Sequence, residues 1–209
     1  MSKKKKGKTF YAIVDFETTG VSTTRDFPIQ IGIIICDENL EELGKMSEYI
    51  KTPDTVQYYQ EVKHEEGQWS REHHGAFKVH KIRFNKWQEK AMPSNKVVDL
   101  ILYSCLPESG VNYREDNVYL VSDNIFFDMA FMKRMWAYSE EPWPFHYAGM
   151  DGRILWNWLG LERQGDPKEH DALSDCKYLL RHLKIAKEII DAKRTTDTIP
   201  RSTKDSPAT

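Results

Sequence analysis

The spacing of apolar side chains changes several times along the chain, and each spacing predicts a structural element. Residues 10–15, 29–37 and 117–122 are short apolar runs rich in β-branched and aromatic residues, a pattern that favours strands. The run at 29–37 is almost continuously apolar, which indicates a strand buried on both faces. Residues 45–51 predict a further strand that returns antiparallel to it. The opening of the chain is therefore expected to form a three-stranded meander.

Later stretches place apolar side chains on one side of a helix, with a period of about 3.6 residues. These stretches are residues 95–105, 123–138, 151–159 and 170–193. A meander followed by helices and one more strand is typical of a mixed α/β domain. We therefore expect a central mixed sheet that is flanked by helices.

The two ends of the chain differ in composition from the part between them. Residues 1–8 contain a run of four lysines, and residues 194–209 consist largely of Thr, Ser, Pro and charged residues. Such segments are usually solvated and poorly ordered. A chain of 209 residues is long enough for one domain with a substantial core. We predict that domain over residues 9–193, between a basic flexible N-terminus and a flexible C-terminal tail.

The composition says more about the cellular compartment of the protein than about whether it binds nucleic acid. The three cysteines form no CxxC pair, which favours reduced thiols in the cytoplasm over a disulfide framework. No apolar run approaches the roughly 20 residues that span a bilayer, and the start of the chain lacks the pattern of a signal peptide. We therefore expect a cytoplasmic protein without a membrane segment. The net charge of −2 neither favours nor excludes nucleic acid, because carboxylates in a site would mask a basic rim.

The first candidate functional residues lie at the end of the first predicted strand. Asp15 and Glu17 lie two residues apart, so strand alternation turns both carboxylates to one face. Two adjacent, partly buried anions repel each other unless a cation compensates them. Oxygen ligands of this kind suit hard divalent ions such as Mg²⁺. Taken alone, the pair is more typical of a solvated strand end before a turn.

A second cluster stands at the start of the helix predicted after residue 122. Asn124 and Asp128 lie four residues apart and therefore share one side of that helix. Taken alone, they have a structural explanation. Asn124 or Asp123 would cap the helix, and Asp128 would be a first-turn acid that the helix dipole favours.

A third cluster stands at the start of the long helix. His170 is expected on the loop before it, and Asp175 is expected to point inward from its second turn. A histidine on a loop is able to exchange protons near neutral pH. A surface histidine is the structural alternative, and Asp171 is predicted to be an N-cap or first-turn acid.

In this order and at this spacing, the three clusters resemble the motifs of the DEDDh exonucleases. This family of the ribonuclease H-like superfamily includes the proofreading subunit of bacterial replicative polymerases and ribonuclease T. The matching motifs are Asp15-Phe16-Glu17-Thr18-Thr19-Gly20, Asn124-x-x-x-Asp128 and His170-x-x-x-x-Asp175. Three short motifs in the right order are far more specific than any one of them. The resemblance covers about residues 8–190 and implies a ribonuclease H-like, mixed five-stranded sheet flanked by helices.

The resemblance also implies an activity, that of a metal-dependent 3′→5′ exonuclease that releases nucleoside monophosphates from single-stranded DNA or RNA ends. Two divalent ions, Mg²⁺ or Mn²⁺, would be held by Asp15, Glu17, Asp128 and Asp175. His170 would be the general base. The substrate side would be formed by Thr18, Thr19, Gly20, Asn124 and His80.

Three smaller features leave alternatives open. Residues 79–82 resemble the family's His-Gly-Ile segment, but Lys81 replaces its glycine. A structural metal site is the other interpretation of the histidines in this region, although their spacing fits no common zinc finger; these are His64, His73, His74 and His80. Gln30, near a Glu or Gln position of the family, is predicted to make a polar contact within the sheet.

The tryptophans fall into two groups according to the residues around them in the sequence. Trp69 and Trp87 lie near the basic run at 78–90, so they are the better candidates for stacking on bases, with a solvated face as the alternative for the run. Three others lie in helical patterns and are predicted to be core residues: Trp136, Trp156 and Trp158. Phe127 is predicted to be a core residue as well, with a place in the groove of the first motif as the alternative.

Two other functions remain open from the sequence. One is a nucleic-acid-binding module that no longer cuts. The other is a proofreading or recruitment subunit that acts in trans with a polymerase or another replication or repair protein. Single-stranded DNA is the first expected substrate and RNA the second, because the motifs do not distinguish them.

Overall fold

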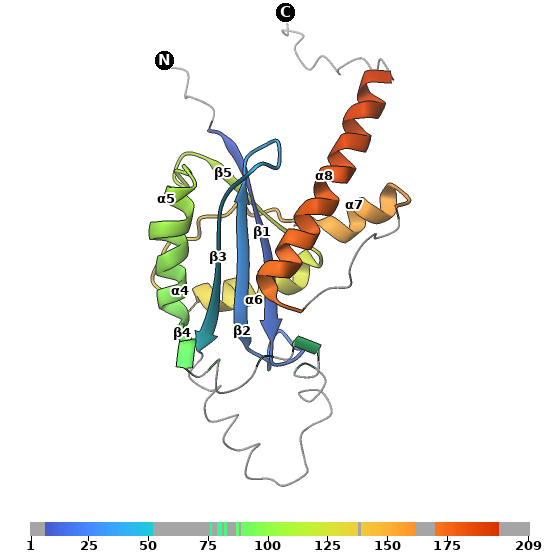
Figure 1. The fold of residues 1–209 in the computed structure, drawn as a ribbon. Helices are drawn as coiled ribbons and strands as arrows, with labels where there is room; N and C mark the ends of the chain where they lie inside the picture. Colours follow the sequence, from blue (N-terminus) through green and yellow to red (C-terminus); the bar gives the residue numbers. More distant parts are fainter. Residues whose placement is uncertain are drawn as a thin grey trace, which may run out of the picture.

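The computed structural model describes residues 7–51, 76, 79, 80, 82, 87, 89–137, 139–161 and 170–196. Within these residues the centre of the fold is a sheet of six strands in the order β4-β3-β2-β1-β5-β6 (Figure 1). The strands are β1 (Thr9–Thr18), β2 (Pro28–Cys36), β3 (Glu42–Lys51), β4 (Met92–Pro93), β5 (Asn117–Ser122) and β6 (Met150–Asp151). The first three form the predicted antiparallel meander, and β5 pairs with β1 in parallel.

The number of strands corrects the sequence-based expectation of five. The outermost strands β4 and β6 each contain two residues and pair in parallel with β3 and β5. Two residues are too few for an alternation of apolar and polar positions. The mixed α/β fold itself is as expected.

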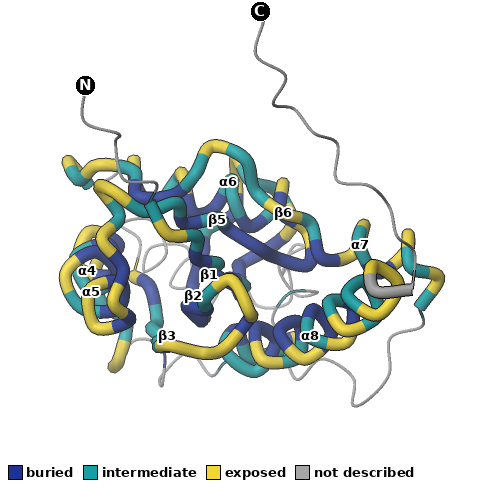
Figure 2. The backbone as a smooth tube through the Cα atoms, turned by 90° about the horizontal axis from the view of Figure 1, so that it is seen from above, coloured by how far each residue is buried: buried dark blue, intermediate teal, exposed yellow. Residues whose placement is uncertain are grey.

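Different helices cover the two faces of the sheet, as seen from above in Figure 2. One face carries α4 (Ser94–Leu100), the π-helical turn η1 (Ile101–Cys105), α5 (Leu106–Glu108) and α6 (Ile125–Trp136). The other carries α8 (Ala172–Thr196), with α7 (Gly152–Trp158) beside it. The predicted helices thus lie within a few residues of their expected ranges.

The strand residues divide between two cores, one on each face. The larger core joins Phe10, Val14 and Phe16 of β1 to buried side chains of α4, η1 and α6. The smaller core joins Ile13 of β1 to buried side chains of α8. All residues of β2 are buried, which agrees with the prediction of a strand covered on both faces.

Two tryptophans lie in environments opposite to those predicted. Trp87 is 1% exposed, packs with Ile29, and donates its indole N–H to the Ile50 carbonyl at 2.9 Å. It is therefore a core residue and does not stack on bases. Trp158 is 85% exposed, so its prediction as a core residue is wrong. Trp136 and Trp156 are buried as predicted.

The remaining predictions concern the cysteines, Phe127, a membrane segment and the basic run with its histidines. The three cysteines are buried and form no disulfide bond, and burial raises the pKa of the Cys36 thiol to about 12. Phe127 packs against the larger core. No helix among the described residues is both long and apolar enough to cross a membrane. Trp69, most of the basic run and three of the four clustered histidines lie outside the described residues.

Candidate active site

The alternation of β1 turns its last acidic residues toward α8. Ile13 belongs to the core beneath α8, whereas Val14 and Phe16 belong to the opposite core. Asp15 and Glu17 follow the parity of Ile13. Glu17 is 7% exposed and Asp15 is half-buried. A strand that is apolar along most of its length therefore ends with two carboxylates on the α8 face.

The start of α8 lies very close to the sheet because β2 has a glycine there. A Cβ atom on Gly32 would lie 2.4 Å from the carbonyl carbon of Ala172 and 2.5 Å from the Leu173 nitrogen. Gly32 pairs with Asp15 in the neighbouring strand. The first turn of α8 therefore sits directly over the acidic end of β1 and brings Asp175 to the same place, one turn earlier in the helix than the sequence predicts.

A side-chain cap fixes where α8 begins. Asp171 Oδ1 accepts a hydrogen bond from the Ser174 N–H at 3.1 Å, as the sequence predicts for an N-cap. His170 stands just before it with a φ of 52°, which is a left-handed backbone conformation that only a small share of non-glycine residues adopt. The chain therefore makes a sharp turn at His170 before it enters the helix.

These local features bring three candidate ligands together. Glu17, His170 and Asp175 each offer one ligand atom, and these atoms all lie within 4.8 Å of one another. Asp175 is 4% exposed. Two buried carboxylates at this separation repel each other and lack hydration, so a cation between them would be strongly stabilised. Carboxylate and imidazole donors of this kind fit a divalent metal ion.

The other two predicted metal ligands lie next to this group without belonging to it. Asp15 lines a small cavity of about 10 Å³ together with Asp175 and Asp123. Asp128 is 3% exposed, and its Oδ1 accepts a hydrogen bond from the Phe16 N–H at 3.2 Å. Asp128 therefore contacts the backbone between the two acids of β1.

The loop after β1 is held by a buried acid that no sequence motif marks. Asp26 is 4% exposed and accepts hydrogen bonds from the Thr19 hydroxyl at 3.4 Å and from the Ser22 N–H at 2.7 Å. A Cβ atom on Gly20 would lie 2.4 Å from Asp26 Oδ2. The glycine of the first motif therefore has a local packing reason. Thr18 is buried and donates its hydroxyl to the Gly20 carbonyl at 2.6 Å.

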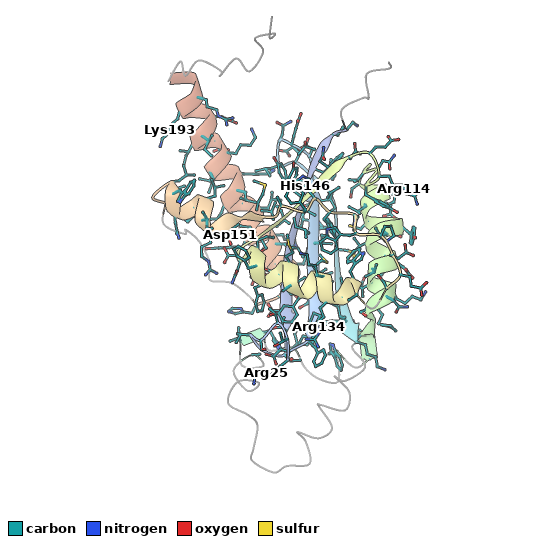
Figure 3. The ribbon with its side chains drawn as sticks, turned by 180° about the vertical axis from the view of Figure 1, so that it is seen from behind. Arg25, Arg114, Arg134, His146, Asp151 and Lys193 are labelled. Atoms are coloured by element: carbon teal, nitrogen blue, oxygen red, sulfur yellow. The ribbon has the colours of Figure 1, made fainter. Side chains whose placement is uncertain are left out.

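An arginine of α6 fastens the same loop to the helix. Arg134 donates to the Asp26 carbonyl, and its guanidinium lies 4.2 Å from the centre of the Phe27 ring. Figure 3 shows Arg134 and Arg25 near the same end of the molecule. No motif marks Arg134, because the bond joins residues that are 108 positions apart.

His80 lies beside the candidate ligands and is buried. It is 6% exposed, and its Nδ1 accepts a hydrogen bond from the Ile82 N–H at 3.0 Å. Burial, and after it the nearby His170, lowers the pKa of His80 to about 4, while a hydrogen bond with the Thr18 backbone acts in the opposite direction. The imidazole is therefore uncharged at neutral pH, and it stands between the first motif and the third.

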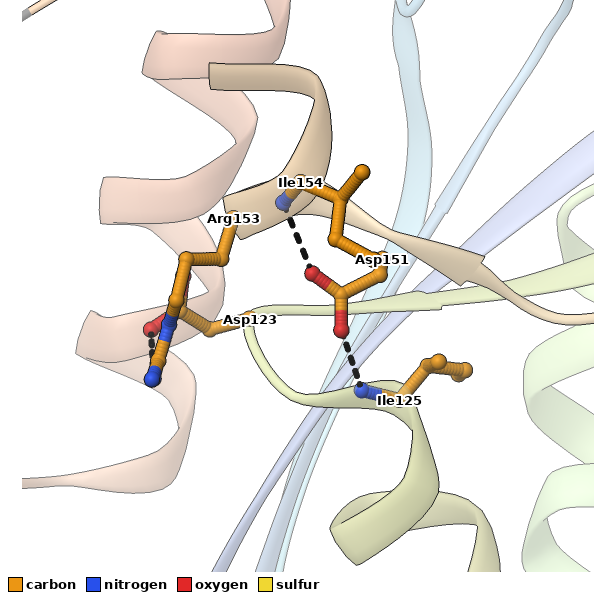
Figure 4. Close-up of polar contacts among 5 residues, drawn as sticks. All are labelled: Asp123, Ile125, Asp151, Arg153 and Ile154. Atoms are coloured by element: carbon orange, nitrogen blue, oxygen red, sulfur yellow. Dashed lines mark hydrogen bonds and ion pairs between the residues drawn. The ribbon is translucent and has the colours of Figure 1, made fainter. Parts of the chain in front are cut away.

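The start of α6 is capped from a distant part of the chain. Asn124 occupies the N-cap position and is exposed, but its side chain makes no capping hydrogen bond. The Asp151 carboxylate instead accepts from the Ile125 N–H at 3.2 Å and from the Ile154 N–H of α7 at 2.9 Å (Figure 4). Asp151 thus joins the starts of two helices.

An ion pair lies beside this double cap. Arg153 and the buried Asp123 are 3.1 Å apart, and Figure 4 shows the pair next to Asp151. Asp123 also lines the small cavity with Asp15 and Asp175. Arg153 therefore offsets part of the negative charge that gathers at this end of the sheet.

Comparison with known proteins gives a likeness in structure and none in sequence. A scan against protein-family models and a search of the curated proteins found no match. Among solved structures, E. coli exonuclease I in a complex with single-stranded DNA matches with a TM-score of 0.63 at 15% identity, over 90% of this chain and 43% of that one. Exonuclease I from Methylocaldum szegediense matches with a TM-score of 0.63 at 16% identity, over 86% and 40%.

A complex of E. coli exonuclease I with a dT13 oligonucleotide matches similarly, with a TM-score of 0.61 at 14% identity over 88% of this chain and 41% of that one. These likenesses show that the chain has a fold similar to that of exonuclease I. The chain spans less than half of the length of these proteins.

Proposed function

We propose that this chain is a metal-dependent 3′→5′ exonuclease of the DEDDh type, which releases nucleoside monophosphates from single-stranded ends. One observation carries the proposal. Ligand atoms of Glu17, His170 and Asp175, which come from a strand, a loop and a helix, lie within 4.8 Å of one another. Residues so far apart in sequence rarely gather two buried carboxylates and an imidazole without a role for them.

Single-stranded DNA is the proposed substrate, and RNA ends are the second substrate class. Support comes from the fold, because several of the exonuclease I structures that it resembles are complexes with single-stranded DNA or oligonucleotides. The loop that contains Thr18, Thr19 and Gly20 is firmly braced, which suits a surface that holds the terminal nucleotide in one position. Asn124 and His80 complete this proposed substrate side.

The proposed metal ligands are Asp15, Glu17, Asp128 and Asp175, and the proposed ions are two Mg²⁺ or Mn²⁺. When bound, such ions lower the pKa of an attacking water and neutralise charge on the phosphate. The residues fit this role because carboxylate oxygens suit hard divalent cations, and because Glu17, Asp128 and Asp175 are buried acids.

His170 is the proposed general base. It lies at the edge of the carboxylate group on a loop and is only partly buried, so a proton that it accepts is able to pass to solvent. Its neighbour His80 stays uncharged at neutral pH because burial lowers its pKa to about 4. The base therefore works next to an imidazole that does not add positive charge.

The test is cleavage of a single-stranded DNA oligonucleotide with a label at its 5′ end. The parent protein should shorten it stepwise from the 3′ end with Mg²⁺ or Mn²⁺ and not with EDTA. Asp15→Ala should abolish cleavage, and His170→Ala should remain folded but turn over slowly. Cleavage by Asp15→Ala at the parent rate would overturn the proposal. A matched RNA oligonucleotide decides between the two substrate classes.

The same assay separates the other functions. A binding module would retain the oligonucleotide on a filter without shortening it. A proofreading or recruitment subunit would cut and would also co-purify with a polymerase or another replication or repair protein.

A further inference from the structure

A buried side chain of β2 reaches across to the segment that leads into α8. Gln30 is 3% exposed, and its Nε2 donates to Asp171 Oδ2 at 2.9 Å and to Ser47 Oγ at 3.2 Å. Its Oε1 has no hydrogen-bond partner among the described residues. The carboxamide is therefore held through its NH₂ group, which faces a carboxylate 141 positions away in the sequence.

Asp171 divides its two oxygens between the sheet and the helix. Oδ2 accepts from Gln30, while Oδ1 accepts from the Ser174 N–H at 3.1 Å. The Asp171 carbonyl accepts from the Asp175 N–H at 2.9 Å. Asp171 therefore links the first turn of α8 to β2. It also accepts a hydrogen bond from the backbone of Asp175, a proposed metal ligand.

His170, the residue before Asp171, has an unfavourable backbone conformation. His170 has a φ of 52°, and a non-glycine residue keeps such a conformation only where its surroundings hold it there. The described contacts that do so are on its C-terminal side. Asp171 is bonded to Gln30, and Ala172 lies against Gly32, which is two residues further along the same strand.

We propose that Gln30 is a positioning residue, whose hydrogen bond to Asp171 holds His170 beside Glu17 and Asp175. This inference rests on the proposed exonuclease function, in which His170 accepts the proton of the attacking water. Gln30 acts through Asp171 and touches neither the substrate nor a reacting atom. Because small displacements of a catalytic group have large effects on rate, loss of the bond should lower turnover more than substrate binding.

The decisive variants exchange the donor and the acceptor. Gln30→Glu keeps nearly the same shape but places a second carboxylate against that of Asp171. The value of kcat should therefore fall by about 10- to 100-fold, while KM stays within about twofold. Gln30→Glu combined with Asp171→Asn restores a donor opposite an acceptor, and asparagine is also a good N-cap. This pair should therefore recover most of the lost turnover.

A second measurement asks whether the effect passes through His170. In a His170→Ala background, Gln30→Glu should cause little further loss, because the group that it positions is already absent. An equal fold-loss in both backgrounds would mean a general structural role and would overturn the proposal. Ser47→Ala is the matched control, since it removes the other partner of Gln30 and should leave kcat unchanged.

The ring signals of His170 in nuclear magnetic resonance spectra of the metal-free protein provide a readout that needs no activity. They should move in Gln30→Glu, return in the exchanged pair and stay unchanged in Ser47→Ala. Should the parent protein fail to cut while these signals behave as expected, the positioning holds and the exonuclease function fails. A parent that cuts, with Gln30→Glu equal to it in kcat and in these signals, would overturn the positioning alone.

Discussion

The two faces of the central sheet use one strand for different purposes. Even-numbered residues of β1, from Phe10 to Phe16, are buried in the larger core beneath α4, η1 and α6. Odd-numbered residues begin the same way on the α8 face, with Tyr11 and Ile13 in contact with its core. The next odd-numbered residues, Asp15 and Glu17 at the end of the strand, are acids.

The difference shows how one face stabilises the fold while the other concentrates charge. The larger core continues to the end of β1, where the rings of Phe16 and Phe131 have centroids 6.4 Å apart. On the α8 face the apolar contacts stop earlier, and the first turn of the helix lies over Gly32 and brings Asp175 beside Glu17 instead. Stability and chemistry are therefore expected to respond to different substitutions.

The largest expected effect is on the α8 face. Asp175→Asn keeps the shape of the side chain but removes a charged ligand from the group with Glu17 and His170. Cleavage should fall by about 1000-fold or more, because several kcal/mol of transition-state stabilisation are lost and each 1.4 kcal/mol is a factor of ten. Initial rates on a labelled oligonucleotide measure this. Asp191→Asn, the same change near the C-terminal end of α8, should keep the parent rate.

The next effect tests the close approach of α8. A Cβ atom on Gly32 would collide with the backbone of Ala172 and Leu173, so Gly32→Ala should displace the first turn of the helix and lower kcat by about 100-fold. Gly44→Ala is the control, because its Cβ would meet the Ser109 hydroxyl at 2.3 Å, a side chain that is able to rotate away. Equal activity of both variants would contradict the importance of this contact.

The larger core should respond in stability. Leu102 is 0% exposed on the opposite face, and Leu102→Ala should lower the free energy of unfolding by about 2–5 kcal/mol. The rate of cleavage per folded molecule should stay near that of the parent. Urea unfolding and an assay below the transition measure the two quantities. Tyr103→Ala, at the exposed neighbour, should change stability little, and a large loss of rate in Leu102→Ala would break the division between the faces.

The smallest effect concerns pH and His80. Its pKa is about 4 in the fold and 6.5 as an ordinary histidine, so the unfolded chain binds a proton first as the pH falls. The stability that His80 contributes is therefore present above pH 6.5 and is lost toward pH 4. Between pH 7.5 and 5 the loss should be about 2 kcal/mol. Urea unfolding in EDTA should show this loss in the parent and not in His80→Gln, and identical slopes would contradict it.

Much of the fold could be predicted because its patterns are local. The runs at 10–15, 29–37 and 117–122 became β1, β2 and β5, since buried strands need apolar side chains whatever lies around them. The environments of Trp87 and Trp158 could not be predicted in this way. Trp87 lies among polar neighbours in sequence but packs on Ile29. Trp158 is the last residue of α7 and is exposed, whereas Trp156 in the same turn is buried.

The candidate site could be predicted only where motifs mark it. The resemblance named Glu17, His170 and Asp175 together, although nothing in their spacing states that strand, loop and helix converge. The supports of the site carry no such mark. Asp26 braces the loop after β1, and Asp151 caps two helices. These residues act through contacts that only the folded chain creates.

Binding of Mn²⁺ measured by isothermal titration calorimetry tests the central claim most directly, because it needs neither substrate nor turnover. The parent protein should bind the ion, and the double variant Glu17→Gln/Asp175→Asn should lose this binding while keeping its fold, as judged by circular dichroism. Heats of binding that are the same in the folded double variant and in the parent would contradict a metal centre at the end of β1.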